Sequence, residues 1–126
     1  MKENTIIPIY CQQAIQDKRI VVWGDGSRMQ NYIHISDAVK LINKIVENDV
    51  KVNFPILGVS KKEYSNAQLA EIIGTHTDSE IIFDGIDVSK SVQYDNTISQ
   101  KAVNWQPEMD LETRIKQFLE WKQKQF

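Results

Sequence analysis

The sequence predicts a small α/β domain with about five helices and a few short strands. The first observation is the stretch 19–46, which has the residue pattern of a strand, a glycine turn, a second strand and an amphipathic helix. The second is that short apolar runs and helix-capping signals alternate along the rest of the chain. The third is composition, because 126 residues with 41% hydrophobic and 25% charged side chains suffice for one modest core.

The first helix is expected over Thr5–Lys18, with Pro8 in its first turn, where a missing N–H costs little. Four of its apolar residues fall on one side of the helix: Ile7, Cys11, Ala14 and Ile15. Residues 20–23 follow, and they are β-branched or aromatic types that favour a strand. Gly24 and Gly26 then predict a turn.

A second strand and a helix complete this stretch. Residues 30–35 alternate between polar and apolar types, so Ile33 and Ile35 would share one face of a strand. Ser36 is then expected to cap the helix, with Asp37 in its first turn. The apolar face of this helix would be formed by Ala38, Leu41, Ile42, Ile45 and Val46.

The remaining elements are shorter and follow from local signals. Residues 54–59 predict an edge strand, because Pro55 cannot donate to a central ladder. Ser65 and Gln68 form a capping box for a helix that Gly74 would end. Three further elements are expected: a strand over residues 80–83, a helix starting at residues 95–97 and a last helix capped by Asp110.

Charge and composition exclude several classes of function. A formal net charge of −2 argues against nucleic acid as the main partner, because binding to phosphates needs a basic face. Cys11 is the single cysteine, so an intrachain disulfide is impossible and a reducing compartment is expected. No apolar run approaches the about 20 residues that span a bilayer, and the first ten residues lack a signal-peptide pattern. We therefore expect a cytoplasmic protein without a membrane partner.

The glycine turn is not a dinucleotide-binding fingerprint. The run Gly24–Met29 lacks the third glycine, and a strand follows it where the fingerprint requires a helix. His34 and His76 lack metal-ligand spacing, so no metal site is expected. His34 is expected to form a hydrogen bond within the sheet, and His76 to lie in a loop.

Four features carry a resemblance to a known family: Trp23-Gly24-Asp25-Gly26, the strand 30–35, Asp37 at the helix start, and Trp105-Gln106-Pro107. Together they resemble the substrate-binding lobe of the extended short-chain dehydrogenase/reductase family, the NAD-dependent sugar-nucleotide epimerases and dehydratases. The resemblance spans roughly residues 5–121. It implies a single C-terminal substrate-binding domain over residues 1–126, without the Rossmann half of the enzyme. It also implies that residues 54–59 join the sheet of that absent half.

The resemblance further implies that this chain alone neither binds a cofactor nor catalyses a reaction. The family's acid/base pair is a Tyr followed four residues later by Lys, and none of the four tyrosines has that partner. NAD or NADP is implied for the full-length enzyme only.

Two candidate substrate-binding residues are carried over by position. In the resembling enzymes the backbone of the strand before Gly-Asp-Gly contacts the nucleotide base, and its aromatic residue packs nearby. These positions are Val21 and Trp23 in this chain. The alternative is that Trp23 is a core residue. Trp105 and Trp121 are expected to be structural.

The family binds the diphosphate with arginines, since a guanidinium can bind phosphate oxygens through two hydrogen bonds. Neither arginine is present, because one position holds Gln30 and the other falls in residues 85–88. Arg28 and Lys90 could partly substitute for them. Alternatively, each is a solvated surface charge.

The expected function is therefore the sugar-nucleotide binding part of an NAD-dependent epimerase or dehydratase, whose missing Rossmann domain is its partner. One alternative is a stand-alone, non-catalytic binding or interaction module. Another is the lobe of a reductase with a non-nucleotide substrate, which explains the missing arginines equally well.

Overall fold

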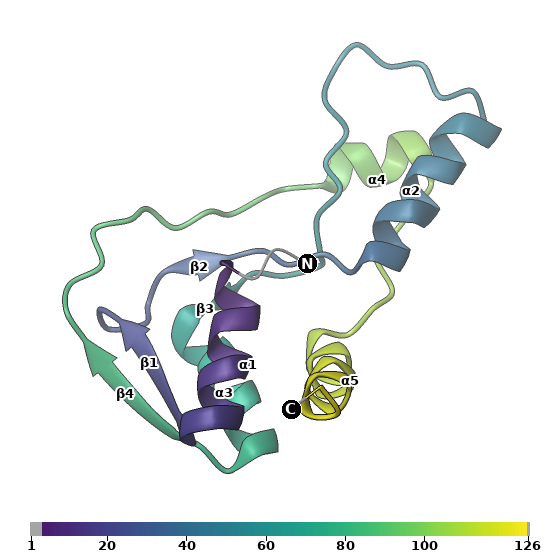
Figure 1. The fold of residues 1–126 in the computed structure, drawn as a ribbon. Helices are drawn as coiled ribbons and strands as arrows, with labels where there is room; N and C mark the ends of the chain where they lie inside the picture. Colours follow the sequence, from purple (N-terminus) through teal and green to yellow (C-terminus); the bar gives the residue numbers. More distant parts are fainter. Residues whose placement is uncertain (1–3, 126) are drawn as a thin grey trace.

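The computed structural model describes residues 4–125, and these form five α-helices and two small sheets (Figure 1). Among these residues, every helix is too short or too polar to cross a membrane. In chain order the elements are α1 (Ile6–Asp17), β1 (Arg19–Trp23), β2 (Met29–Gln30), α2 (Ile35–Glu47), β3 (Tyr64–Ser65), α3 (Asn66–Thr77), β4 (Glu80–Asp84), α4 (Thr97–Val103) and α5 (Leu111–Gln123).

Each sheet has two strands. β1 and β4 are parallel, with Arg19 opposite Glu80 and Trp23 opposite Asp84. Parallel neighbours need a crossover connection, and here it contains α2 and α3. β2 and β3 are antiparallel and pair only Met29 with Ser65 and Gln30 with Tyr64.

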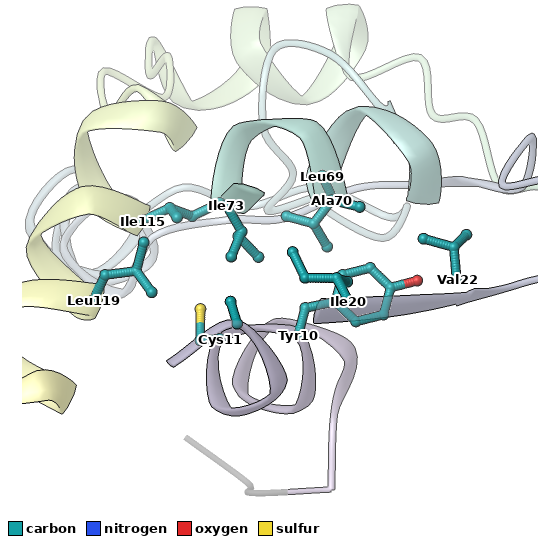
Figure 2. Packing of buried hydrophobic residues seen from close by; sticks show 10 residues of the cluster. Tyr10, Cys11, Ile20, Val22, Leu69, Ala70, Ile73, Ile115 and Leu119 are labelled. Carbon is teal, nitrogen blue, oxygen red and sulfur yellow. The ribbon is translucent and has the colours of Figure 1, made fainter. Parts of the chain in front are cut away.

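The main core lies where α1 and α3 pack on β1 and α5 closes one side (Figure 2). Ile20 and Val22 of β1 are fully buried, and they face the same side because strand side chains alternate. The rest of the cluster comes from the three helices and comprises Tyr10, Cys11, Ala14, Leu69, Ala70, Ile73, Ile115 and Leu119. Burial raises the pKa of the Cys11 thiol to about 12, so this cysteine is an inert core residue.

A second, smaller core joins α2 and α4, which lie side by side and away from β1 and β4 (Figure 1). Its buried residues are Leu41, Val103 and Trp105. Asp37 connects this part to the segment before α5, because its carboxylate accepts the backbone N–H of Glu108 and of Met109, each at 3.0 Å. Trp105 is structural, as expected.

The predicted fold class is confirmed, and most predicted elements are present. α1 begins after Thr5 and ends before Lys18, as expected. The capping box is formed, since Ser65 Oγ accepts the N–H of Gln68 and Gln68 Oε1 accepts the N–H of Ser65. Asp110 caps α5, as predicted, and Ile115 and Leu119 of this helix are buried in the main core.

The prediction of a strand over residues 30–35 is wrong beyond Gln30. His34 is the N-cap of α2, since its ring Nδ1 accepts the N–H of Ser36 at 3.1 Å. The helix therefore starts one residue before Ser36, which was the predicted cap. Ile33 packs on the second core while Ile35 is 71% exposed, so the two residues do not share a face. His34 caps a helix and does not bond within a sheet.

Two further predictions are wrong. Residues 54–59 form no strand; instead, the N–H of Leu57 donates to Ser99 Oγ at 2.9 Å. Gly74 does not end α3, which continues to Thr77 and places His76 in its last turn. Gly74 lies within the helix, at a position where a Cβ would come within 3.3 Å of the Ser79 carbonyl oxygen, so this close approach favours glycine. The helix is closed by Asp78 in the left-handed conformation.

The predicted apolar face of α2 is only partly buried. Leu41 is buried, but Ile42 is 57% and Val46 is 73% exposed. With Ile35 and Val39, these two residues form an exposed apolar stripe along α2.

Candidate functional site

Four of the five predicted site residues line one open cleft of about 630 Å³. It lies between the start of α1, the end of β1, β2 and the segment after β4. Val21, Trp23, Arg28 and Gln30 all contribute to its wall. The other lining residues are Thr5, Ile6, Ile9, Tyr10, Tyr32, Asn66, Asp87 and Ser89. We call this the Trp23 cleft.

Trp23 is an exposed wall of the cleft rather than a core residue. As the last residue of β1 it is 56% exposed, so the alternative that Trp23 belongs to the core is wrong. Its ring lies against Gly85, where any Cβ would overlap the indole. The N–H of Gly24 donates to the Asp84 carbonyl at 2.7 Å and holds the two turns together. A flat, exposed ring at the edge of a cleft can stack on a planar or sugar ring.

Arg28 is a half-buried cation of the cleft rather than a fully solvated surface charge. Its Nε is buried and lacks a hydrogen-bond partner within the described residues. Its backbone is fixed, because its carbonyl accepts the N–H of Asn66 at 3.0 Å. A buried guanidinium donor without an acceptor is costly, and an anionic ligand can supply the acceptor.

Gln30 and Val21 already use part of their hydrogen-bonding capacity. Gln30 Nε2 donates to Asn66 Oδ1 at 2.8 Å, and both side chains line the cleft. The backbone N–H of Val21 donates to Gln13 Oε1 at 3.0 Å, so this donor is satisfied within the protein.

Tyr10 and Tyr32 also line the cleft, although the sequence analysis did not select them. Burial raises the pKa of Tyr32 to about 12, and the hydroxyl of Tyr32 is buried without a hydrogen-bond partner within the described residues. Burial also raises the pKa of Tyr10, with a smaller contribution from the charge of Asp87. Both phenols are therefore protonated near neutral pH and can donate a hydrogen bond. One signal in the sequence could have selected Tyr32. It occupies a position on the polar side of the alternating run 30–35, opposite Ile33.

The segment after β4 closes the remaining side of the cleft. Asp87 Oδ1 accepts the N–H of Ser89 at 2.9 Å. The backbone of Asp87 packs closely on Gly24, because a Cβ atom built on Gly24 would lie 2.8 Å from Asp87. Lys90, the fifth predicted residue, is exposed and does not line the cleft, although the neighbouring Ser89 does.

A second, more enclosed cavity of about 150 Å³ shares Tyr32 with the Trp23 cleft. It lies mainly between α5 and residues 32–34, and apolar side chains such as Ile33, Ile115 and Phe118 line much of it. None of the five predicted site residues contributes to it, so the Trp23 cleft is the candidate site.

Comparison with known proteins gives a consistent result at the level of fold, although no protein-family model matches the chain. The curated UDP-N-acetyl-alpha-D-glucosaminuronate decarboxylase of Bacillus cytotoxicus is 27% identical over 92% of this chain. The dTDP-glucose 4,6-dehydratase of Bacillus anthracis, solved with NAD, superimposes with a TM-score of 0.84 at 17% identity over 98% of the chain. The UDP-glucose 4-epimerase of Thermotoga maritima, solved with UDP-glucose, gives 0.82 at 19% identity over 98% of the chain.

This is the fold of the C-terminal part of the extended short-chain dehydrogenases. The resemblance seen in the sequence is thereby confirmed. The chain spans 39% of the length of the decarboxylase and 40% and 41% of the two solved structures. The NAD of the dehydratase structure agrees with the cofactor that the resemblance implies for a full-length enzyme.

Proposed function

We propose that this chain is the substrate-binding part of an NAD-dependent sugar-nucleotide epimerase or dehydratase. In this proposal the Trp23 cleft holds the nucleotide end of the substrate, and the Rossmann domain of the same enzyme, the partner of this chain, supplies NAD and the catalytic residues. Such an enzyme would act in the cytoplasm. The observation that carries the proposal is the convergence of Val21, Trp23, Arg28 and Gln30 on one cleft, although they were selected from sequence alone.

The cleft supplies the types of group that a nucleotide needs. The Trp23 ring offers a stacking surface, and Arg28 offers a charged donor for phosphate. The amides of Gln30 and Asn66 offer directional hydrogen bonds for hydroxyls. Holding the nucleotide end would fix the position of the sugar relative to the cofactor, and such positioning lowers the barrier to hydride transfer.

A second candidate is the lobe of a reductase with a non-nucleotide substrate. The hydrogen bond between the side chains of Gln30 and Asn66 favours this candidate. In the resembling family the position of Gln30 holds an arginine that binds the diphosphate, whereas here it holds an uncharged amide that already bonds to Asn66.

A binding experiment tests the first candidate. Tryptophan fluorescence and calorimetry would follow titration of the chain with uridine, UMP, UDP and UDP-glucose. Trp121→Phe is a matched control, because Trp121 is also 56% exposed but lies on α5, outside the cleft. We expect uridine ligands to change the fluorescence of the wild type and of Trp121→Phe but not of Trp23→Phe. If no uridine ligand binds, the first candidate is wrong.

A further inference from the structure

One face of α2 is apolar, exposed and free of charged side chains. Its residues lie four, three and four positions apart along the helix, a spacing that places them in one line and is typical of a helix-packing seam. Their side chains are between 46% and 73% exposed. The positions that flank this line are also uncharged, and they are Ser36, Ala38, Asn43 and Ile45. We call the four exposed residues the α2 stripe: Ile35, Val39, Ile42 and Val46.

The fold of this chain uses the opposite face of α2. Asp37 and Leu41 lie on that face and are buried. Three of the four charged side chains of α2 bind the segment 104–109. Asp37 accepts two of its backbone N–H groups, Lys40 pairs with one of its carboxylates at 3.0 Å, and Lys44 donates to one of its carbonyls. The α2 stripe is therefore not needed to hold the helix in place.

An exposed apolar line without charged neighbours is typical of a contact surface. On a free helix face, long charged side chains commonly lie over the apolar groups and keep their charged ends in water. Here most charges of α2 are turned toward the segment 104–109 instead. A helix that is apolar on two opposite faces is normally buried on both, so we infer that a partner covers the α2 stripe.

The size of the stripe favours a domain of the same polypeptide over a second copy of this chain. Interfaces between separate proteins commonly use about 20 to 30 residues on each side. A domain that belongs to the same polypeptide meets the stripe at a high effective concentration, so a smaller contact suffices. The relatives named above are more than twice as long as the part that this chain matches, which leaves room for a further domain.

The α2 stripe also starts close to the Trp23 cleft along the chain. Gln30 lines the cleft, and Ile35 begins α2 five residues later (Figure 1). An extended segment of this length spans at most about 18 Å. A domain seated on the stripe can therefore approach a ligand in the cleft, as a domain that supplies NAD must do to position it for hydride transfer.

We propose that the α2 stripe is the surface on which the Rossmann domain of the same enzyme docks. The proposal rests on the function proposed above and names the contact between the two parts of that enzyme. The docking side of the Rossmann domain is apolar opposite Val39 and Ile42, because burial of an unpaired charge there would be costly. Docking buries α2 on both faces and adds to the support that the smaller core gives this helix.

Cysteine labelling tests this assignment. Cys11 is the single cysteine of the chain and is fully buried, so an introduced surface cysteine is labelled against a low background. Ile42→Cys and Val46→Cys report on the α2 stripe. Glu120→Cys is the control, because Glu120 is exposed on α5, outside the stripe. Each variant would be made in the isolated chain and in the full-length enzyme, and peptide mass spectrometry would give the alkylation rate at each position.

We expect both stripe cysteines to be alkylated as fast as the control in the isolated chain. In the full-length enzyme they should react more slowly by about tenfold or more, because alkylation then requires the domains to open. The control should react equally in both proteins. Equal rates at the stripe positions in both proteins would overturn the proposal. Protection in the isolated chain that increases with its concentration would also overturn it, because a second copy would then cover the stripe.

The outcomes separate the inference from the function on which it rests. A stripe that stays reactive in a full-length enzyme that binds UDP-glucose would overturn the docking surface and leave the proposed function intact. A protected stripe in an enzyme that binds no uridine ligand would keep the docking surface and remove the ligand assignment. If the intact mass of the protein from its source cell corresponds to 126 residues, the proposed function fails and the inference fails with it.

Discussion

At the scale of single residues, Asp37 has the clearest structural role. It is 1% exposed, and its two carboxylate oxygens accept the N–H groups of Glu108 and Met109. Asp37→Ala would remove the acceptor of both part-buried hydrogen bonds and leave a gap at a fully buried side chain, so we expect a loss of about 3 kcal/mol in the free energy of unfolding. Asp37→Asn should lose less, because the amide oxygen still accepts one bond. Urea unfolding measures the free energy of unfolding of both variants, with Asp17→Ala, at an exposed position, as the control. Equal losses of stability in the three variants would refute the structural role of Asp37.

A second prediction concerns the contact that places Trp23. Gly85 has a φ of 70°, and a Cβ there would overlap the indole of Trp23. Gly85→Ala should cost about 2 kcal/mol of stability, partly from the left-handed backbone and partly from displacement of the ring. In a Trp23→Ala background only the backbone part remains, so the same change should cost about 1 kcal/mol. Thermal unfolding of the four proteins gives this double-mutant cycle, and additive costs would show that the two residues are not coupled.

At the scale of elements, the caps of the helices make stability depend on pH. Hydrogen bonds from the Thr113 side chain and backbone lower the pKa of Asp110 below the ordinary 3.8, which means that folding stabilises the ionised form. This contribution is complete above about pH 4 and is lost as the pH falls through the lowered, folded-state pKa. Asp110→Asn should therefore be less stable than the wild type at pH 7 and approach it at pH 2 to 3. Urea unfolding across this range tests the prediction, and a stability difference independent of pH would contradict it.

Elements with strong local signals could be predicted from sequence, and elements that depend on distant partners could not. The capping box at Ser65 and the cap at Asp110 are formed by residues three positions apart, so the sequence contains all the information they need. The strand predicted over residues 54–59 would need a neighbour, and its Leu57 N–H donates to Ser99 instead. Gly74 lies inside α3, which ends at Thr77 with Asp78 in the left-handed conformation, so the glycine signal marks a close approach to Ser79 and not the helix end.

The same distinction explains the candidate site. Trp23, Arg28 and Gln30 follow one another along a short stretch, so motif order could select them. Asp87 and Asn66 reach the cleft from segments far away in the sequence, through the contact with Gly24 and the bond to Gln30. Their contribution depends on the parallel pairing of β1 with β4 and on the docking of α3, which are tertiary features.

At the scale of the whole molecule, the two cores differ greatly in size. Within residues 4–125, the core around β1 buries ten hydrophobic residues, whereas the core between α2 and α4 buries three. Apolar burial supplies most of the stability that resists local opening, so the smaller core should open more easily. The exposed apolar stripe of α2 contributes nothing to that core in this chain.

We therefore expect a hierarchy in native-state amide hydrogen exchange. Amides of α2 and α4 should exchange through local opening, with free energies clearly below those of β1 and α3. Leu41→Ala should cost about 2 to 5 kcal/mol in the smaller core, and so remove most protection from α2 and α4. Protection in β1 and α3 should persist, because their contacts to α1 and α5 do not involve Leu41. A uniform loss of protection across all elements would instead show that the two cores unfold as one cooperative unit, with the Asp37 bonds transmitting the change between them.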